Sequence, residues 1–264
     1  MKIYEVNQID DNSYYINDED NDSCYLIVGT TNALLIDCGL FKEALLPTIK
    51  QITDLEILLV LTHGHGDHVG CISEFNNVYM SSKDKDVYFW NQEKFPDIKL
   101  IDYNDIRLIK NHQELNIGNK IIELVELPGH TPGSLLVVDS SNKTIYTGDA
   151  IGSGCGVWMQ IPHTLPLSSY RDSLKEVIEY LEYIGVDDNW QFWGGHNQQE
   201  SMSKVSSFNK LDFSLMKDMK VLCDKLLNDE IQGTLSKAPT FTDESAYYAS
   251  FGKAEMIYKL ANKC

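Results

Sequence analysis

Three histidines and one aspartate lie within six residues of this 264-residue chain: His63, His65, Asp67 and His68. An apolar run at residues 57–61 precedes them and predicts a buried strand that ends just before the cluster. At a strand end, His63 and His65 can turn toward one centre, while Asp67 and His68 can face a second. Imidazole and carboxylate are ligands of zinc-type sites, so this spacing predicts metal binding rather than histidines that pair only with water or backbone.

Three more candidate ligands, His130, Asp149 and His196, stand beside glycines where other predicted strands end. The set divides into two predicted centres, with His63, His65 and His130 in the first and Asp67, His68 and His196 in the second. Asp149 can bridge them, because a carboxylate has two oxygens. With no cysteine in the set, the ligands predict two divalent ions, most simply zinc, with iron or manganese as alternatives. Three protein ligands and a bridge leave a position for water, as in catalytic centres.

The elements that must position these residues alternate between strands and helices. Residues 25–28 and 33–36 predict a hairpin after an acidic loop at 10–22, and a helix at 41–52 leads into the strand at 57–61. The further expected elements are strands at 78–80, 120–127, 135–138, 144–146 and 191–193, a helix or loop at 83–90, and a helix at 168–184 capped by Ser169 and Asp172. The pattern favours an α/β (α+β) fold.

Beyond residue 200 the pattern changes to helical spacing, at 208–227 and again at 244–260. We therefore expect a catalytic domain at residues 1–200 and a C-terminal helical extension at 201–264 that packs on it.

The composition restricts the partners. With 22 Lys and Arg against 39 Asp and Glu, the formal net charge is -17, which argues against nucleic acid as a partner. The six cysteines form no CxxC pair and predict reduced thiols. Neither an apolar leader core nor a run of eighteen apolar residues is present, so we expect a cytoplasmic protein with a small-molecule substrate and no membrane partner. A homodimer is left open.

The sequence resembles the metallo-β-lactamase superfamily of hydrolases over roughly residues 1–200. The resemblance rests on four motifs in order: His63-x-His65-x-Asp67-His68, Pro128-Gly129-His130-Thr131-Pro132-Gly133, Gly148-Asp149 and Gly195-His196. It implies a four-layer αβ/βα sandwich with the seven side chains named above as metal ligands at the sheet edges. Asp37 also matches a family position that supports the metal loop, although on residue grounds a turn-capping role is an equal alternative.

Within that family, the chain is similar to the glyoxalase II-like group, which hydrolyses thioesters. The resemblance implies a hydroxide held between the two metals as nucleophile, with Asp67 as a proton shuttle. Glyoxalase II's basic residues for glutathione are not identifiable here, so the thioester assignment is made at the level of the class. The alternatives are a lactonase, a β-lactamase-type hydrolase, a mononuclear iron sulfur dioxygenase that uses only His63, His130 and Asp149, and a metal-binding module without activity.

Substrate selection is expected in the segment after the bridging aspartate, at residues 149–166. Trp158 and Met159 supply an apolar wall there, and His163 is a candidate for substrate contact. An ordinary loop with a buried Trp158 is the alternative. Tyr247 and Tyr248 are candidates to close the pocket, with core packing as their alternative role.

Overall fold

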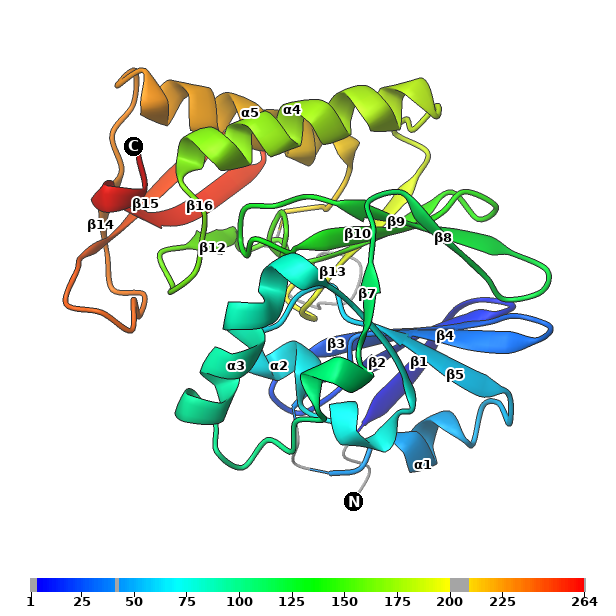
Figure 1. Ribbon diagram of the computed structural model, residues 1–264. Coiled ribbons are helices and arrows are strands. Elements are labelled where there is room, and N and C mark those ends of the chain that lie inside the picture. Colours follow the sequence, from blue (N-terminus) through cyan, green and yellow to red (C-terminus); the bar gives the residue numbers. More distant parts are fainter. Residues whose placement is uncertain (1–3, 41–42, 200–208, 264) are drawn as a thin grey trace.

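The computed structural model describes residues 4–40, 43–199 and 209–263, which form two large sheets packed face to face with helices outside them (Figure 1). The first sheet has seven strands in chain order: β1 (Glu5–Asp10), β2 (Ser13–Asn17), β3 (Ser23–Val28), β4 (Asn32–Ile36), β5 (Glu56–Val60), β6 (Asn77–Ser81) and β7 (Arg107–Ile109). Neighbours are antiparallel from β1 to β4 and parallel from β4 to β7.

The second sheet has the order β13-β11-β10-β9-β8. Its strands are β8 (Gln113–Asn116), β9 (Ile121–Glu126), β10 (Leu135–Asp139), β11 (Thr144–Gly148) and β13 (Gln191–Gly194). Hairpins join β8 to β9 and β9 to β10, while β13 runs parallel to β11.

Alternation along β3 shows why two sheets and two helical layers form. Leu26 belongs to a core shared with the first helical layer, whereas Tyr25 and Ile27 belong to the central core between the sheets. Both faces of this strand are buried, because successive side chains of a strand point to opposite faces. The expected αβ/βα sandwich is confirmed.

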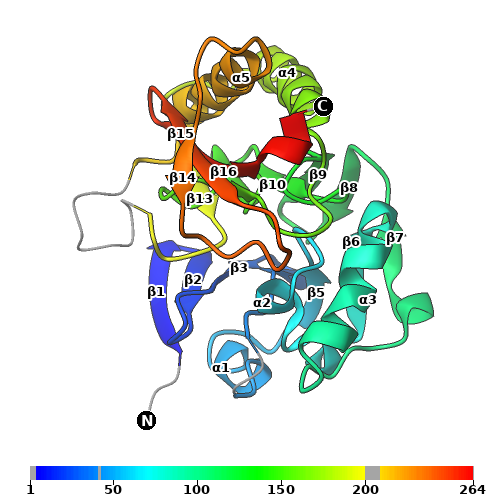
Figure 2. The same ribbon diagram turned by 90° about the vertical axis from the view of Figure 1, so that its left-hand side faces the viewer.

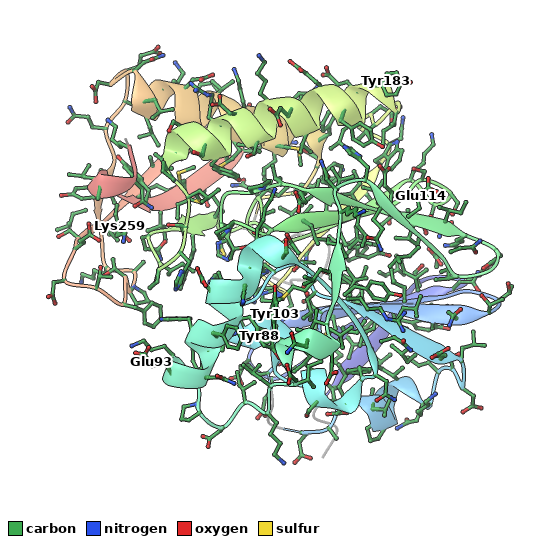
Figure 3. The ribbon with its side chains drawn as sticks, in the orientation of Figure 1. Tyr88, Glu93, Tyr103, Glu114, Tyr183 and Lys259 are labelled. Atoms are coloured by element: carbon green, nitrogen blue, oxygen red, sulfur yellow. The ribbon has the colours of Figure 1, made fainter. Side chains whose placement is uncertain are left out.

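The first helical layer carries α1 (Leu46–Ile49), α2 (Gly66–Val69) and α3 (Lys85–Lys94). The second carries α4 (Leu167–Tyr183) and α5 (Phe213–Leu227), which pack on each other above the second sheet (Figure 1). In α4 the apolar stripe through Leu174, Val177 and Leu181 is buried, while Tyr183 at its C-terminal end is 87% exposed and points into solvent (Figure 3).

Several sequence expectations need correction near the N-terminus. The acidic stretch at 10–22 is not only a loop, because it contains β2. The helix expected at 41–52 is a single turn, α1, and residues 41–42 lie outside the described part of the chain. Ser169 and Asp172 do not cap α4: the helix begins earlier, after Pro166, with no side-chain cap.

The C-terminal extension is not all helical. Residues 234–259 form a small sheet of β14 (Thr234–Ser236), β15 (Ala246–Phe251) and β16 (Ala254–Lys259), where a helix was expected at 244–260 (Figure 2). The buried residues Ala254, Met256 and Tyr258 alternate with half-buried ones, which is the period of a strand. Gly252, at φ +57°, makes the tight turn between β15 and β16. The expected start of α5 at 208 lies outside the described residues, and Asp212 caps the helix.

β12 (Val157–Met159) joins this C-terminal sheet by pairing in parallel with β16. A strand from the first 200 residues is thus a member of the C-terminal sheet, and the domain division at residue 200 stays a prediction. None of the helices in the described ranges is both long and apolar enough to cross a bilayer.

Candidate metal centre

The seven candidate ligands come from four loops that meet at one edge of the sandwich. His63 and His65 follow β5, Asp67 and His68 lie on α2, and the others follow β9, β11 and β13, namely His130, Asp149 and His196. Their ligand atoms form three overlapping groups, each with all atoms within 4.8 Å of one another: His63, His65 and His130; His63, His68 and Asp149; Asp67, His68 and His196. The structure therefore brings every candidate ligand to one place.

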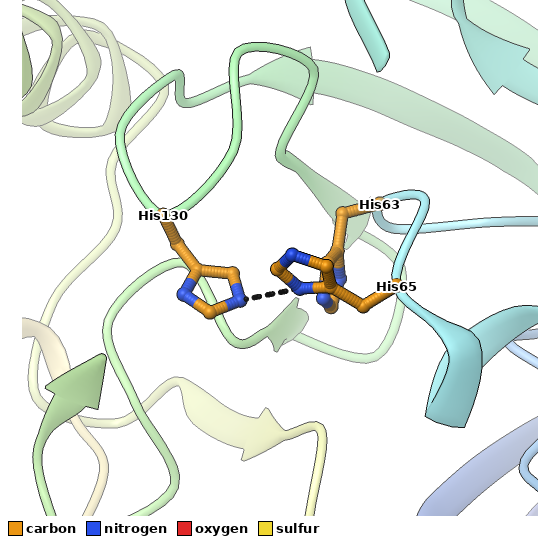
Figure 4. A group of neighbouring side chains, drawn as sticks. All are labelled: His63, His65 and His130. Carbon is orange, nitrogen blue, oxygen red and sulfur yellow. Dashed lines mark hydrogen bonds between the residues drawn. The ribbon is translucent and has the colours of Figure 1, made fainter. Parts of the chain in front are cut away.

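In the first group, His63 and His65 face His130 from the opposite loop (Figure 4). His65 Nδ1 lies 3.1 Å from His130 Nε2. Two nitrogens that bind one zinc tetrahedrally at about 2.0–2.1 Å stand about 3.3 Å apart, so the spacing fits a shared cation. Imidazole nitrogens at this spacing suit a divalent cation.

Hydrogen bonds fix which ring nitrogen of each histidine is available. His130 Nδ1 donates to the Trp158 carbonyl oxygen at 2.8 Å, which leaves Nε2 to face the group. The Thr62 hydroxyl gives its single proton to Asp37, and it therefore accepts from His63 Nδ1 at 3.1 Å. His63 Nε2 is buried and has no hydrogen-bond partner among the described residues. Such an orphaned lone pair fits a metal ligand.

The group of His63, His65 and His130 and the group of Asp67, His68 and His196 correspond to the two predicted centres and are here called the first and second group; Asp149 stands between them. Its Oδ2 lies 3.1 Å from His196 Nε2, 3.7 Å from His130 Nε2 and 3.8 Å from His68 Nε2. Asp67 approaches His68 and His196 with one oxygen each, at 3.9 and 3.8 Å. Asp149 Oδ1 is a further buried atom without a partner among the described residues. One carboxylate is thus within reach of two neighbouring cation positions.

Two aspartates outside the ligand set orient this second group. Asp37 accepts from Thr62 N and Thr62 Oγ1, both at 2.7 Å, and from His68 Nδ1 at 2.8 Å. Asp22 Oδ1 lies 3.0 Å from His196 Nδ1. Each leaves Nε2 of its histidine directed at the site, and such carboxylate–histidine pairs are typical supports of metal ligands. For Asp37, the structure thus shows more than a turn cap.

A third buried aspartate, Asp84, ties two of the ligand loops together. Its oxygens accept from Gly64 N at 2.7 Å, Thr131 Oγ1 at 2.9 Å and Gly133 N at 2.5 Å. Gly64 lies between His63 and His65, and Thr131 follows His130. One side chain therefore sets the distance between the two loops of the first group.

The electrostatics of the two groups differ. Burial, followed by repulsion from neighbouring imidazoles, lowers the pKa of His63 well below its usual value. Burial and His130 lower the pKa of His65 to about 3. These rings are therefore neutral and keep lone pairs for a metal.

In the second group burial would also lower the pKa of His68, but Asp37, Asp67 and Asp149 outweigh it and raise that pKa well above its usual value. The pKa of Asp149 shifts well below its usual range although burial opposes this, because His196 and His68 stabilise the carboxylate. The carboxylates of this group therefore favour positive charge close to them, either on the histidines or on a bound cation.

A cavity of about 410 Å³ opens onto the candidate ligands. Trp158 lines it, as expected, and is 37% exposed. Met159 does not line it, because its side chain is fully buried in the core under α4 and α5. His163 is also absent from the lining: its ring lies at the edge of Trp90, with centroids 6.2 Å apart.

Tyr247 and Tyr248 do not close the cavity either. Tyr247 packs against the Tyr258 ring and the core around it, and Tyr248 donates to Glu255 at 2.8 Å. Tyr247 thus takes the packing role that was its alternative, whereas Tyr248 is hydrogen-bonded to a side chain of the neighbouring strand.

Among the described residues around the site, those not identified from the sequence include Asp22, Asp84, Trp90 and Phe241. Trp90 and Phe241 line the cavity from α3 and from the loop between β14 and β15. Their partners are distant in sequence, and no short motif marks them. For Asp84, a signal was available in its position at a strand-to-helix junction, directly before α3.

Comparisons with known proteins agree with this geometry. The sequence model of the metallo-beta-lactamase superfamily matches residues 17–183. The probable polyketide biosynthesis zinc-dependent hydrolase PksB of Bacillus subtilis (strain 168) is 31% identical over 142 residues, 51% of this chain and 57% of that protein. The hydroxyacylglutathione hydrolase GloC of Haemophilus influenzae is 30% identical over 134 residues, 47% of this chain and 63% of that protein. The matches thus span less than two thirds of these two relatives.

The crystal structure of the DIM-1 metallo-beta-lactamase exposed to ceftazidime superposes with a TM-score of 0.62 at 17% identity. The superposition covers 84% of this chain and 97% of that one. At this identity the likeness concerns the fold alone.

Proposed function

Because the chain belongs to the metallo-β-lactamase superfamily, we propose that it is a metal-dependent hydrolase that cleaves a thioester or related ester of a small molecule. The observation that carries the proposal is the pair of three-ligand groups with Asp149 between them. Such an arrangement suits two divalent ions, with zinc as the proposed metal and iron or manganese as alternatives. Two relatives support it through their names, one as a zinc-dependent hydrolase and one as a hydroxyacylglutathione hydrolase.

Divalent metal bound by these ligands would supply Lewis acidity, which lowers the pKa of water and favours negative charge on a carbonyl oxygen. The chain's own residues hold and aim the ligands. Asp37 and Asp22 keep Nδ1 protonated on His68 and His196, and the Trp158 carbonyl does so on His130. These bonds fix the rings before substrate arrives, so little reorganisation is needed during the reaction.

Asp67 is the proposed proton carrier. It lines the cavity, and its oxygens lie 3.9 Å from His68 Nε2 and 3.8 Å from His196 Nε2. Burial opposes its ionisation, but these two histidines lower its pKa below the usual range. Asp67 is therefore a carboxylate at neutral pH that can take a proton and return it to the leaving group.

A lactone is the second candidate substrate, because it is a cyclic ester open to the same chemistry, and the apolar side of the cavity suits its acyl chain. A mononuclear iron sulfur dioxygenase would use only His63, His130 and Asp149. The compact second group of Asp67, His68 and His196 favours two metals over one.

The test is a panel assay of metal-replete protein against an acyl-glutathione, an acyl-CoA, a homoserine lactone and a cephalosporin, with metal content measured in parallel. We expect two metals per chain, turnover of an ester or thioester, and loss of both in Asp149→Ala. Full activity in Asp149→Ala would contradict the proposal, and one iron with oxygen-dependent turnover would favour the dioxygenase.

A further inference from the structure

Five of the aromatic and apolar side chains that line the cavity are here called the apolar wall: Trp90, Phe95, Trp158, Ile161 and Phe241. It is assembled from three separate segments, namely α3 with the residue after it, the β12 region and the loop between β14 and β15. Trp90 is its centre, because both Phe95 and Phe241 meet its ring nearly edge-on with centroids 6.0 Å apart.

The apolar wall begins at the candidate metal ligands themselves. The Trp90 ring lies 6.3 Å from the ring of His65. Phe95 packs on the ligand loop so closely that a Cβ atom at Gly66 would stand 3.0 Å from its Cδ2. A group bound at the metals therefore has an aromatic surface directly beside it.

The outer part of the apolar wall is left open to solvent. Trp158 is 37% and Phe241 56% exposed, and both line the cavity. Phe241 is also held at φ +55°, a conformation that bulky residues rarely adopt. Local strain combined with exposed aromatic surface is common where a ligand is clamped.

A second part of the cavity lining is polar. Asp22 Oδ1 and Ser153 Oγ both contact His196, whose Nε2 lies 3.8 Å from Asp67 Oδ2, and Asp20 and Gln198 also line the cavity. A substrate with one apolar end and one polar end can therefore bind in two orientations, and in only one of them does each end contact residues of its own polarity. The apolar end meets the apolar wall, and the polar end lies toward His196.

We propose that the apolar wall is an acyl subsite, so that the protein prefers esters or thioesters with an aromatic or extended apolar acyl group. This inference rests on the proposed hydrolase function and names its substrate class. The volume of about 410 Å³ falls within the usual range for small-molecule sites and leaves room for a ring beside the reacting carbonyl.

The test compares two N-acetylcysteamine thioesters, phenylacetyl and acetyl, which share one leaving group. Metal-replete wild type should show kcat/KM higher by about 10- to 100-fold for phenylacetyl, after division by the uncatalysed rates, since burying a ring is worth about 1.5–3 kcal/mol. Hydrolysis of both with a ratio near one would overturn the acyl subsite and leave the hydrolase function intact.

Variants locate the preference. Phe241→Ala and Trp158→Ala should each reduce the phenylacetyl-to-acetyl ratio by about fivefold or more, because each removes part of the buried contact. Leu235→Ala is the matched control: this leucine is 73% exposed on β14, does not line the cavity, and should leave the ratio unchanged. An unchanged ratio in both aromatic variants contradicts the proposal.

Binding gives a readout that does not need turnover. Phenylacetate should bind more tightly than acetate by calorimetry, and Phe241→Ala should remove most of that difference. If wild type hydrolyses no ester at all, the proposed function fails, and this binding comparison still decides the subsite. Equal binding of the two acids, or a difference that survives Phe241→Ala, overturns it.

Discussion

The two sides of the cavity are built in different ways. The ligand side, the seven candidate metal ligands, is largely buried, and hydrogen bonds to Asp22, Asp37, Asp84 and Trp158 hold its loops. The apolar wall is half-exposed and held by ring-edge contacts. This difference indicates that substitutions in the polar network around the ligands should disturb the reaction centre. Single substitutions in the apolar wall should instead change the substrate preference.

The largest expected effect on activity comes from removing a ligand on the ligand side of the cavity. His130→Ala should lower kcat/KM by at least about 10³-fold and reduce the metal content, because it removes a ligand from the first group. His163→Ala is the matched control, since this exposed imidazole does not line the cavity and meets the Trp90 ring edge-on at 6.2 Å, and its kcat/KM should stay within about threefold of wild type. Steady-state kinetics with metal analysis checks both variants. Equal losses of kcat/KM in the two variants would contradict the assignment of His130 as a ligand.

The next effect concerns the pH dependence of stability through Asp84. Burial, opposed by bonds from Thr131, Gly133 and Gly64, raises its pKa from 3.8 to about 6. Because the folded protein binds this proton more tightly than the unfolded chain, the stabilisation is full below about pH 4 and is lost as the pH rises to about 6. This pKa difference of about two units corresponds to about 3 kcal/mol in the free energy of unfolding.

Urea unfolding of chelator-treated wild type and Asp84→Asn at pH 4 and pH 6 measures that loss. The variant should lack this part of the pH dependence, and Asp86→Asn, which changes an exposed carboxylate in the first turn of α3, should keep it. Identical pH dependence in wild type and Asp84→Asn would show that Asp84 does not titrate in this range.

A smaller effect is expected from Asp37→Asn, which keeps the size of the side chain and changes what it offers to His68 Nδ1 and Thr62. Metal affinity should fall by about 10- to 100-fold, as for other partners of metal-binding histidines. Competition with a chromophoric zinc chelator gives the dissociation constant, with Asp187→Asn as an exposed control. Unchanged affinity would mean that the ligand side does not depend on its supporting carboxylates.

The smallest effect is expected on the apolar wall. Phe241→Ala should lower the free energy of unfolding by about 1 kcal/mol or less, because its ring is mainly exposed and loses one edge contact. Chemical denaturation checks this. A loss of several kcal/mol would mean that the apolar wall is part of the folding core.

The sequence was most informative where chemistry and local pattern coincide. Three histidines and an aspartate after an apolar strand predicted both β5 and the place where the ligands meet. The same reasoning failed at residues 244–260, because a few apolar residues match helical and strand periods almost equally, and pairing with distant β12 decides between them. The position of Asp84 before α3 could have marked it as a helix cap, but its role at the ligand loops could not be predicted, because its partners lie 20 to 49 positions away.

The pairing of β12 with β16 limits how such a protein can be recombined. His130 Nδ1 donates a hydrogen bond to the Trp158 carbonyl oxygen, and Trp158 pairs with Ile257 of the C-terminal hairpin. A chimera with a different C-terminal segment would lose the strand with which β12 pairs, and with it the support that positions the Trp158 carbonyl. Residues 157–159 and 246–259 should therefore be exchanged together when a new specificity is introduced into this protein.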